Sequence, residues 1–336
     1  MKKIWISFLI GVMLGVGLGL FIVKASLVSP GHEVVLKIKP KDTYAQVLNQ
    51  LKSNPNTQHI QWFEWGAKIF SYDKKVHSGR YVVSSNQSII QTIRKLRSGN
   101  QDAVNLVINN VTFRDQLASR VAHYLNIDSN DFLNILTDTT MARQYGLNPE
   151  DFWGMFLCNT YQIYWDISMK DLIAKMNKEY KRFWTEEKIQ QATAKGLLPI
   201  QVIILASIVQ KETNYKPEYG KIASVYLNRL KMGMPLQADP TVKYALKDMS
   251  IKRIINKDLQ FDSPYNTYKY LGLPPGPVGL PELDVVKSVL NAPLENNLYF
   301  CAIYGSGKHV FAKTFQEHLI NARAYQKALN QQSIYR

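Results

Sequence analysis

The stretch PIQVIILASIVQKET, residues 199–213, is the most apolar segment that follows the N-terminal region. Its opening proline suits the first turn of a helix, where no backbone N–H is needed. Leu205, Ile208 and Val209 precede Glu212 by seven, four and three residues, so they share the helix face that carries Glu212. That face is otherwise apolar, and we expect it to point at the core or at the wall of a cleft.

Glu212 is therefore a carboxylate on a hydrophobic helix face, close to the C-terminal end of the predicted helix. Burial disfavours the charged form of a carboxylate and so does the negative end of a helix dipole, so both raise the pKa of Glu212. A glutamate with a raised pKa is suited to general acid catalysis at neutral pH. The alternative is a solvated glutamate in a frayed last turn, and the local sequence leaves both interpretations open.

Two other carboxylates follow closely, and neither is predicted to be a second catalytic acid. Asp239 precedes Pro240, the pattern of a helix N-cap followed by a proline at the first helical position. Glu218 follows Pro217 and is expected to stabilise the first turn of the next helix. Ordinary glycosidases use a pair of carboxylates. One acid/base alone suits a reaction in which the substrate supplies its own nucleophile.

The loop 263–281 is dense in proline, glycine and tyrosine. Sugars present apolar ring faces and directional hydroxyl groups, so aromatic side chains together with amides and hydroxyls are suited to a sugar-binding groove. A rigid surface loop with packed tyrosines is the alternative interpretation. The side chains of the required types in this loop are Tyr265, Asn266, Thr267, Tyr268 and Tyr270.

The composition excludes several classes of protein. The chain has 336 residues, 46% of them hydrophobic, and a mean hydropathy of −0.20, so it should fold and at most a small part lies in lipid. Cys158 and Cys301 are too few for a disulfide scaffold, and we interpret both as buried small side chains, with a bond between them left open. No metal-binding, phosphate-loop, dinucleotide or serine-hydrolase motif occurs, so no metal or cofactor is expected.

The N-terminus predicts a membrane anchor. Lys2 and Lys3 precede an uncharged run of 20 residues, 4–23. As a helix this run is long enough to cross the roughly 30 Å core of a bilayer, and the lysines favour a cytoplasmic N-terminus. A signal peptide is the rival, since VKA at 23–25 resembles a cleavage site. The length of the run favours an uncleaved anchor, because the apolar part of a signal peptide has about 7–15 residues.

The net charge indicates an anionic partner. It is formally +15, from 41 basic and 26 acidic residues. Lys2, Lys3 and Lys24 belong to the anchor and its flanks, so the exported part keeps 38 basic against 26 acidic residues, or +12. A nucleic acid is not expected outside the inner membrane. The charge therefore favours anionic lipid headgroups or an anionic wall polymer.

The periodicity of apolar residues predicts an α+β fold, with a compact module at about 33–103. Residues 104–108 are expected to form a strand, and 146–160 an irregular segment. Thr112 with Asp115 resembles a capping box that opens the helix after this strand.

Apart from the loop 263–281, the C-terminal part is predicted to be helical until a hairpin near its end. Strands over 298–303 and 309–312 are joined by Gly305-Ser306-Gly307, which is typical of a β-hairpin. Thr314 with Glu317 is a capping box for the last helix.

Seven stretches of the sequence form a recognisable set: ASIVQKET (206–213), ASVYLNR (223–229), MGMPLQADPT (232–241), SPYNTYKY (263–270), GLPPGP (272–277), LYFCA (298–302) and HVFAKT (309–314). Together they resemble the endolytic murein (peptidoglycan) transglycosylase family, also called YceG-like. The resemblance covers essentially the whole chain, is strongest over 200–318, and keeps the order and spacing of the family's motifs.

The resemblance implies a domain order for the chain. An anchor at 1–26 is followed by a linker and a LysM-like module at 27–103. A catalytic region at 104–336 comprises a bridging segment, 104–160, and a catalytic core, 161–336. The protein would then be a single-pass protein of the bacterial inner membrane with its catalytic region on the extracytoplasmic side.

The resemblance also implies an enzyme that cuts glycan strands internally and limits the length of nascent strands. It would cleave the MurNAc–GlcNAc β-1,4 bond without water and leave a 1,6-anhydro-MurNAc end. Glu212 matches the catalytic second glutamate of the family's EKET motif and would act as general acid and then base. Gln210 stands where the family usually has the first glutamate. Cys158 and Asn159 stand where the family often has proline and an acid, which argues against a catalytic acid there.

Further residues in the matching motifs are predicted to line the cleft, although a structural role is equally open for Asn228, Arg229 and Asp239. The implied partners are peptidoglycan strands and peptidoglycan synthases. Two alternatives remain: a non-catalytic wall-binding or scaffold protein, and a water-using muramidase, which would need a second carboxylate across the cleft. The predicted lining residues are Asn228, Arg229, Gln237, Asp239, Tyr265, Asn266, Thr267, Tyr268 and His309.

Overall fold

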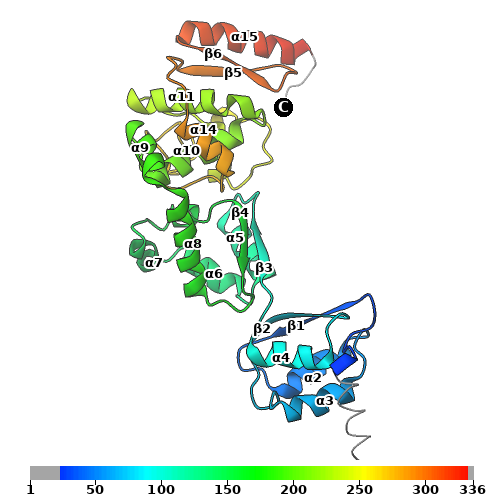
Figure 1. The fold of residues 1–336 in the computed structure, drawn as a ribbon. Helices are drawn as coiled ribbons and strands as arrows, with labels where there is room; N and C mark the ends of the chain where they lie inside the picture. The colour runs from blue at the N-terminus through cyan, green and yellow to red at the C-terminus, as the bar shows by residue number, and fades with distance from the viewer. Residues whose placement is uncertain (1–22, 332–336) are drawn as a thin grey trace, which may run out of the picture. The chain divides into compact units, whose positions relative to one another are not determined.

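The structure is a computed structural model that describes residues 23–331 (Figure 1). The run 4–23 that predicts a membrane anchor lies almost wholly outside these residues. Within 23–331 no single helix is both long and apolar enough to span a membrane. The pair α9 (Glu186–Ala194) and α10 (Pro199–Glu212), bent by 70°, meets the criterion only when both helices are taken together.

The chain forms two compact units. Unit 1 contains the described residues up to Leu106, together with the segments His123–Ile127 and Tyr161–Ser168. Unit 2 contains Val107–Ala122, Asp128–Thr160 and the chain from Met169 onward. The division is therefore not a single cut in the sequence, because two later segments return to unit 1.

The N-terminal part of unit 1 has the order strand, helix, helix, strand, helix. Its two strands are antiparallel, and Val34 pairs with Val83 as Leu36 does with Tyr81. All four side chains are buried, because residues two apart point to the same face of a strand and that face meets the helices. The elements are β1 (Glu33–Ile38), α2 (Tyr44–Ser53), α3 (Ile60–Ile69), β2 (Gly79–Ser84) and α4 (Ile89–Ser98).

Local signals set the ends of α4. The Ser88 hydroxyl accepts a hydrogen bond from the backbone N–H of Gln91, and the Gln91 side-chain oxygen accepts one from the backbone N–H of Ser88. This capping box satisfies two N–H groups that the first turn leaves without helical partners. Gly99 ends the helix at a φ of 71°, in the left-handed region that glycine adopts without strain. The α+β character of this module is confirmed, and its LysM-like nature stays a prediction.

The segment between the module and the helical core differs from expectation at two points. β4 (Asn159–Ile163) pairs with β3 (Val104–Ile108), although 146–160 was expected to be irregular up to its last residue. The predicted capping box is wrong: Gln116, not Asp115, accepts the N–H groups of Thr112 and Phe113. The short elements here are α5 (Arg114–Tyr124), α6 (Ser129–Leu136), α7 (Thr139–Gln144) and a 3₁₀ turn, η1 (Phe152–Met155).

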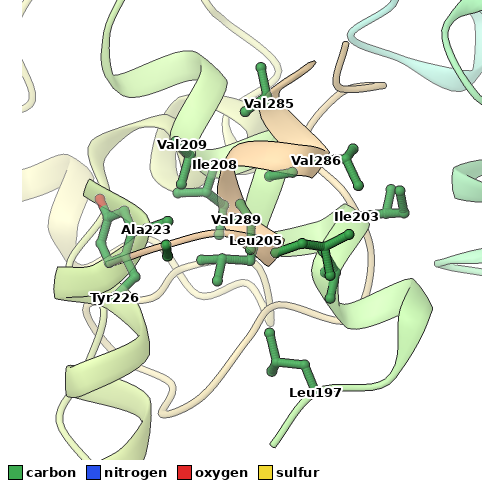
Figure 2. Close-up of a cluster of buried hydrophobic side chains, with 14 of the residues drawn as sticks. Leu197, Ile203, Leu205, Ile208, Val209, Ala223, Tyr226, Val285, Val286 and Val289 are labelled. Carbon is green, nitrogen blue, oxygen red and sulfur yellow. The ribbon is translucent and has the colours of Figure 1, made fainter. Parts of the chain in front are cut away.

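The helical core of unit 2 is built around α10. Nine of the ten residues from Ile200 to Val209 are buried, all except Gln201, so this helix is enclosed on nearly all sides. Figure 2 shows side chains from α10, α11 and α14 gathered in one cluster. The surrounding elements are α8 (Met169–Phe183), α9, η2 (Lys216–Glu218), α11 (Tyr219–Lys231), α12 (Asp239–Ala245), α13 (Asn256–Leu259) and α14 (Leu283–Leu290).

The chain closes with the predicted hairpin and helix. β5 (Tyr299–Ile303) and β6 (Lys308–Ala312) are antiparallel, with Cys301 opposite Val310. α15 (Phe315–Gln331) packs against β5. Its start is confirmed as a capping box, in which Glu317 accepts the backbone N–H of Thr314 while its own N–H bonds to the Thr314 hydroxyl.

Candidate active site

Glu212 ends α10 and is half-buried. Burial raises the pKa of the Glu212 carboxyl from 4.5 to about 7, and the nearby negative charge of Asp239 acts in the same direction. A hydrogen bond from Tyr226 and the positive charges of Lys243 and Arg229 oppose this rise. The expectation of a raised pKa from burial is therefore met, and at neutral pH a large part of the Glu212 population carries a proton.

Tyr226 holds one oxygen of Glu212. Its hydroxyl donates a hydrogen bond of 2.5 Å to Oε1. The ring is 1% exposed and stands edge-on to Phe300, with 5.8 Å between ring centroids. Among residues 23–331 no other hydrogen bond to the Glu212 carboxyl is formed, so Oε2 is the oxygen left for a substrate.

A second carboxylate–tyrosine pair lies beside the first. The Tyr268 hydroxyl donates a hydrogen bond of 2.6 Å to Oδ1 of Asp239. Asp239 is not the N-cap predicted from the sequence: Ala238 is the cap, and Asp239 is the first residue of α12. The side chain of Asp239 is consequently free to face Tyr268 and to act electrostatically on Glu212. The sequence did not predict that a second carboxylate approaches Glu212.

The loop that carries Tyr268 is fixed to the start of α12. Thr267 is buried, its hydroxyl bonds to that of Thr241 at 2.9 Å, and it accepts the backbone N–H of Ala238 at 3.0 Å. Asn266 is fully buried and binds its own loop, donating to the carbonyls of Leu259 and Phe261. These two residues position the loop, and their side chains are occupied by protein groups.

Asn228 and Arg229 tie α11 to the chain before β5. The Asn228 amide donates to the carbonyls of Glu295 and Asn297, at 2.6 and 2.9 Å. Arg229 is 7% exposed and donates to the carbonyls of Leu298 and Leu236, both at 2.7 Å. Both side chains are thus held by backbone groups, while the Arg229 charge still reaches Glu212.

His309 lies on β6 and binds Glu218 rather than Glu212. Its backbone N–H donates to Oε1 of Glu218 at 3.0 Å, and its Nδ1 lies 2.8 Å from Oε2. Glu218 is 7% exposed and stands at the N-cap position of α11, without a capping bond from its side chain, so this pair joins the hairpin to the start of the helix.

Gln237 and Tyr265 are the remaining predicted lining residues. Gln237 is exposed, with φ at 51°, and its backbone N–H bonds to the carbonyl of Thr267. Tyr265 is half-buried and packs on Tyr244, with 4.8 Å between ring centroids.

Two residues that act on Glu212 were not singled out from the sequence: Tyr226 and Lys243. Tyr226 lies in the ASVYLNR stretch, three and four residues after the buried Ala223 and Ile222. A tyrosine on a buried helix face needs a partner for its hydroxyl, and that rule was the available signal. Lys243 carries no comparable signal, because one lysine on a short helix is usually solvated.

Gln210 and Cys158 have structural roles. The Gln210 side chain accepts the backbone N–H of Glu282 at 2.6 Å, which fixes the residue before α14. Cys158 is buried and its thiol contacts the carbonyl of Leu280, while burial raises its pKa to about 12. Both cysteines are free. Over residues 23–331 no cluster of three or more His, Cys, Asp or Glu side chains could hold a metal ion.

A cavity of about 840 Å³ opens at the other end of α10 from Glu212. Leu198, Gln201 and Asn228 are among its lining residues, and Glu212 is not. Of the predicted lining residues, only Asn228 contributes to this cavity. The others lie around Glu212, as Asp239 and Tyr268 do, or serve the loops that support it.

The model of the YceG-like family matches residues 36–324. The chain belongs to the YceG-like family. An endolytic murein transglycosylase of Bacillus subtilis is 29% identical over 324 residues, which cover 89% of this chain and 88% of that protein. An endolytic murein transglycosylase of Streptococcus pneumoniae is 36% identical over 152 residues, 44% of this chain and 27% of the longer relative.

A solved structure of this family has a similar fold. The crystal structure of a YceG-like protein from Listeria monocytogenes matches with a TM-score of 0.55 and 27% sequence identity. The match covers 86% of this chain and 99% of the Listeria chain. The family resemblance noted in the sequence is thus confirmed by sequence and by fold.

Proposed function

We propose that this protein is an endolytic peptidoglycan lytic transglycosylase that uses Glu212 as its general acid and base. The observation that carries the proposal is the Glu212 carboxyl at the end of a buried helix, bound through Oε1 to a buried tyrosine, where burial raises its pKa to about 7. Two relatives bearing the name endolytic murein transglycosylase support the class of enzyme, a lyase acting on murein. Metal and cofactor play no part in the proposed chemistry.

The reaction needs one group that first gives and then accepts a proton. Glu212 donates its proton to the glycosidic oxygen between MurNAc and GlcNAc as the bond from C1 to that oxygen breaks. The C6 hydroxyl oxygen of the same MurNAc then bonds to C1, and its proton returns to the Glu212 carboxylate. The product is a 1,6-anhydro-MurNAc end, and no water is consumed.

Because Tyr226 occupies Oε1, the proton transferred in both steps belongs to Oε2. When the pKa of a carboxyl is close to the working pH, donating this proton and accepting it back both cost little free energy. An ordinary exposed glutamate is ionised at neutral pH and would be a poor acid.

A water-using muramidase is the second candidate, because a second carboxylate, Asp239, acts on Glu212. Asp239 already accepts the Tyr268 hydroxyl through Oδ1, which leaves only Oδ2 to activate a water. The names of the relatives favour the transglycosylase. The chemistry of the new chain end distinguishes the two reactions.

The test uses the full-length chain on purified peptidoglycan, with mass spectrometry of the released ends. We expect 1,6-anhydro-MurNAc ends on the fragments that cleavage within the glycan strands releases. Hydrated reducing ends alone would support the muramidase and refute the transglycosylase. Binding to glycan without cleavage would support the alternative of a wall-binding scaffold.

Glu212→Gln tests the residue itself. We expect this variant to lose activity by about a hundredfold or more, because the amide cannot donate or accept the proton. Glu218→Gln is the matched control, since Glu218 is also a buried glutamate but binds His309. An active Glu212→Gln variant would remove Glu212 from the mechanism.

The cellular setting is part of the same proposal. The apolar run 4–23 anchors the chain in the bacterial inner membrane, with the catalytic region outside the cytoplasm. There the enzyme acts on glycan strands beside peptidoglycan synthases and limits the length of nascent strands. The basic exported part is suited to a surface of anionic lipid and wall polymer.

A further inference from the structure

Two tyrosine–carboxylate pairs stand side by side at the end of α10. Tyr226 donates to Glu212 at 2.5 Å, and Tyr268 donates to Asp239 at 2.6 Å. The two carboxylates come from helices that pack against each other, α10 and α12. The proposed chemistry uses only Glu212, so the Asp239–Tyr268 pair needs a role of its own.

We propose that Asp239, held by Tyr268, is a positioning residue whose negative charge keeps Glu212 in the protonated form that donates to the leaving oxygen. The inference rests on the proposed function of Glu212 and extends it to the residue that sets its protonation. Asp239 acts through Glu212 and transfers no proton itself.

The framework around Asp239 is rigid. Asp239 begins α12, and Pro240 follows it with a fixed φ. The Thr241 and Thr267 hydroxyls bond to each other, and Thr267 also accepts the N–H of Ala238, directly before Asp239. These bonds join the start of α12 to the loop that carries Tyr268. The Asp239 carboxylate is thereby held at one place relative to α10.

The charges around Glu212 come from two helices and one loop, and their signs differ. From α12, Asp239 raises the pKa of Glu212 and Lys243 lowers it. From α11, the Tyr226 hydrogen bond and the Arg229 charge lower it. Tyr268 on the loop is neutral at working pH, because burial and the adjacent Asp239 raise its pKa far above the ordinary value. Among these groups Asp239 alone adds a negative charge.

In this arrangement the second carboxylate, Asp239, has a role other than activating a water, so the presence of two carboxylates does not by itself indicate a hydrolase. Like charges close together make it costly for both to ionise. Asp239 accepts the Tyr268 hydroxyl through Oδ1, and its negative charge disfavours a second one on Glu212, so the proton resides on Glu212. When Glu212 gives this proton to the glycosidic oxygen, two carboxylates face each other. Their repulsion favours the return of a proton from the C6 hydroxyl, which completes the cycle.

The test is Asp239→Asn in the full-length protein, followed through the pH dependence of kcat/KM on peptidoglycan. Asparagine keeps the shape and an oxygen that can accept the Tyr268 hydroxyl, so the variant removes mainly the charge. We expect the alkaline limb of the profile to move to lower pH by about half a unit or more, because Glu212 ionises more easily without its negative neighbour.

Two variants serve as controls. Lys243→Gln removes a positive neighbour of Glu212 and should move the alkaline limb to higher pH, the opposite direction. Asp284→Asn makes the same chemical change as Asp239→Asn on the exposed start of α14, where the side chain is 76% exposed and bound to Lys287. It should leave the limb where it is. Thermal unfolding checks that all variants fold.

The outcomes separate this inference from the proposed function. An alkaline limb unmoved in Asp239→Asn, with Glu212→Gln inactive, overturns the role of Asp239 and keeps that of Glu212. An active Glu212→Gln overturns both. If Asp239→Asn is inactive at every pH, the Glu212 carboxyl is titrated directly by ¹³C NMR of glutamate-labelled protein, its signal assigned by loss in Glu212→Gln. A pKa not lower than in the parent then refutes the inference.

Discussion

At the scale of single residues, opposing contributions from the surroundings set the pKa of the Glu212 carboxyl. Burial and Asp239 favour the neutral form, while Tyr226, Lys243 and Arg229 favour the carboxylate. The result is a pKa of about 7, near the middle of the range over which an acid/base must work in both directions. Removing any one contributor should move the activity profile in a direction that its sign predicts.

Tyr226→Phe should change both the pH profile and the rate. Without the hydrogen bond that stabilises the carboxylate, the pKa of Glu212 rises, and the alkaline limb of kcat/KM moves to higher pH. The rate at the optimum should fall about tenfold, because Oε1 is no longer held and the carboxyl can turn. Steady-state kinetics over pH check both effects. A profile unchanged in position and height would show that this bond has no part in the reaction.

The raised pKa of Glu212 should also make the free energy of unfolding fall as pH rises. Its folded pKa of about 7 lies above the ordinary 4.5, so the folded state binds this proton more tightly than the unfolded state. This contribution is fully present below pH 4.5 and is lost as pH rises through 7. The loss amounts to at most about 3 kcal/mol.

Glu212→Gln has no such dependence, so it should be more stable than the parent at pH 8 and similar to it near pH 5. Thermal unfolding at the two pH values measures this difference. If the difference in stability between variant and parent is the same at both pH values, the pKa of Glu212 is not raised in the folded state.

At the scale of elements, the site depends on three attachments between segments that are far apart in sequence. Arg229 binds the chain before β5, Glu218 binds β6, and Thr267 binds the start of α12. Each attachment satisfies backbone or charged groups that would otherwise be buried without partners. The residues predicted to line a cleft therefore serve mainly to fix the elements that carry Glu212, Tyr226 and Asp239.

Glu218 offers a test of this distinction. Glu218→Ala leaves His309 and its backbone N–H without their buried acceptor and should lower the free energy of unfolding by about 3 kcal/mol. Glu218→Gln keeps an acceptor oxygen and should retain activity. Chemical denaturation and end-group analysis measure the two effects. Loss of activity in a folded Glu218→Gln variant would contradict a structural role for Glu218.

At the scale of the whole molecule, the chain is two compact units whose segments interleave, and the site lies entirely in unit 2. The proposed anchor precedes unit 1 in the sequence. The full-length chain expressed in bacteria should remain in the membrane fraction after washing with high salt and with carbonate. A cleaved signal peptide would instead yield a released protein that begins just after Ala25, which N-terminal sequencing would detect.

The sequence allowed much of the architecture to be predicted, because local rules suffice for it. The hairpin at 299–312, the capping box at Thr314 and the α10 helix all follow from turn residues, capping and apolar spacing. β4 was missed because a short edge strand is set by its pairing with β3, over 50 residues earlier. The sequence predicts the cap one residue late, at Asp239, because Pro240 favours the first helical position and instead occupies the second.

The sequence by itself determined that Glu212 lies on an apolar helix face, because helical spacing is a local consequence of residue order. A raised pKa was one of two interpretations of that face, because burial depends on the whole fold. Only the tertiary structure decided which groups meet it. Tyr226, Asp239 and Lys243 come from other helices, and Tyr268 from a loop 56 positions later. Electrostatic interaction depends on distance in space rather than in sequence, so the partners that set the Glu212 proton became visible only after folding.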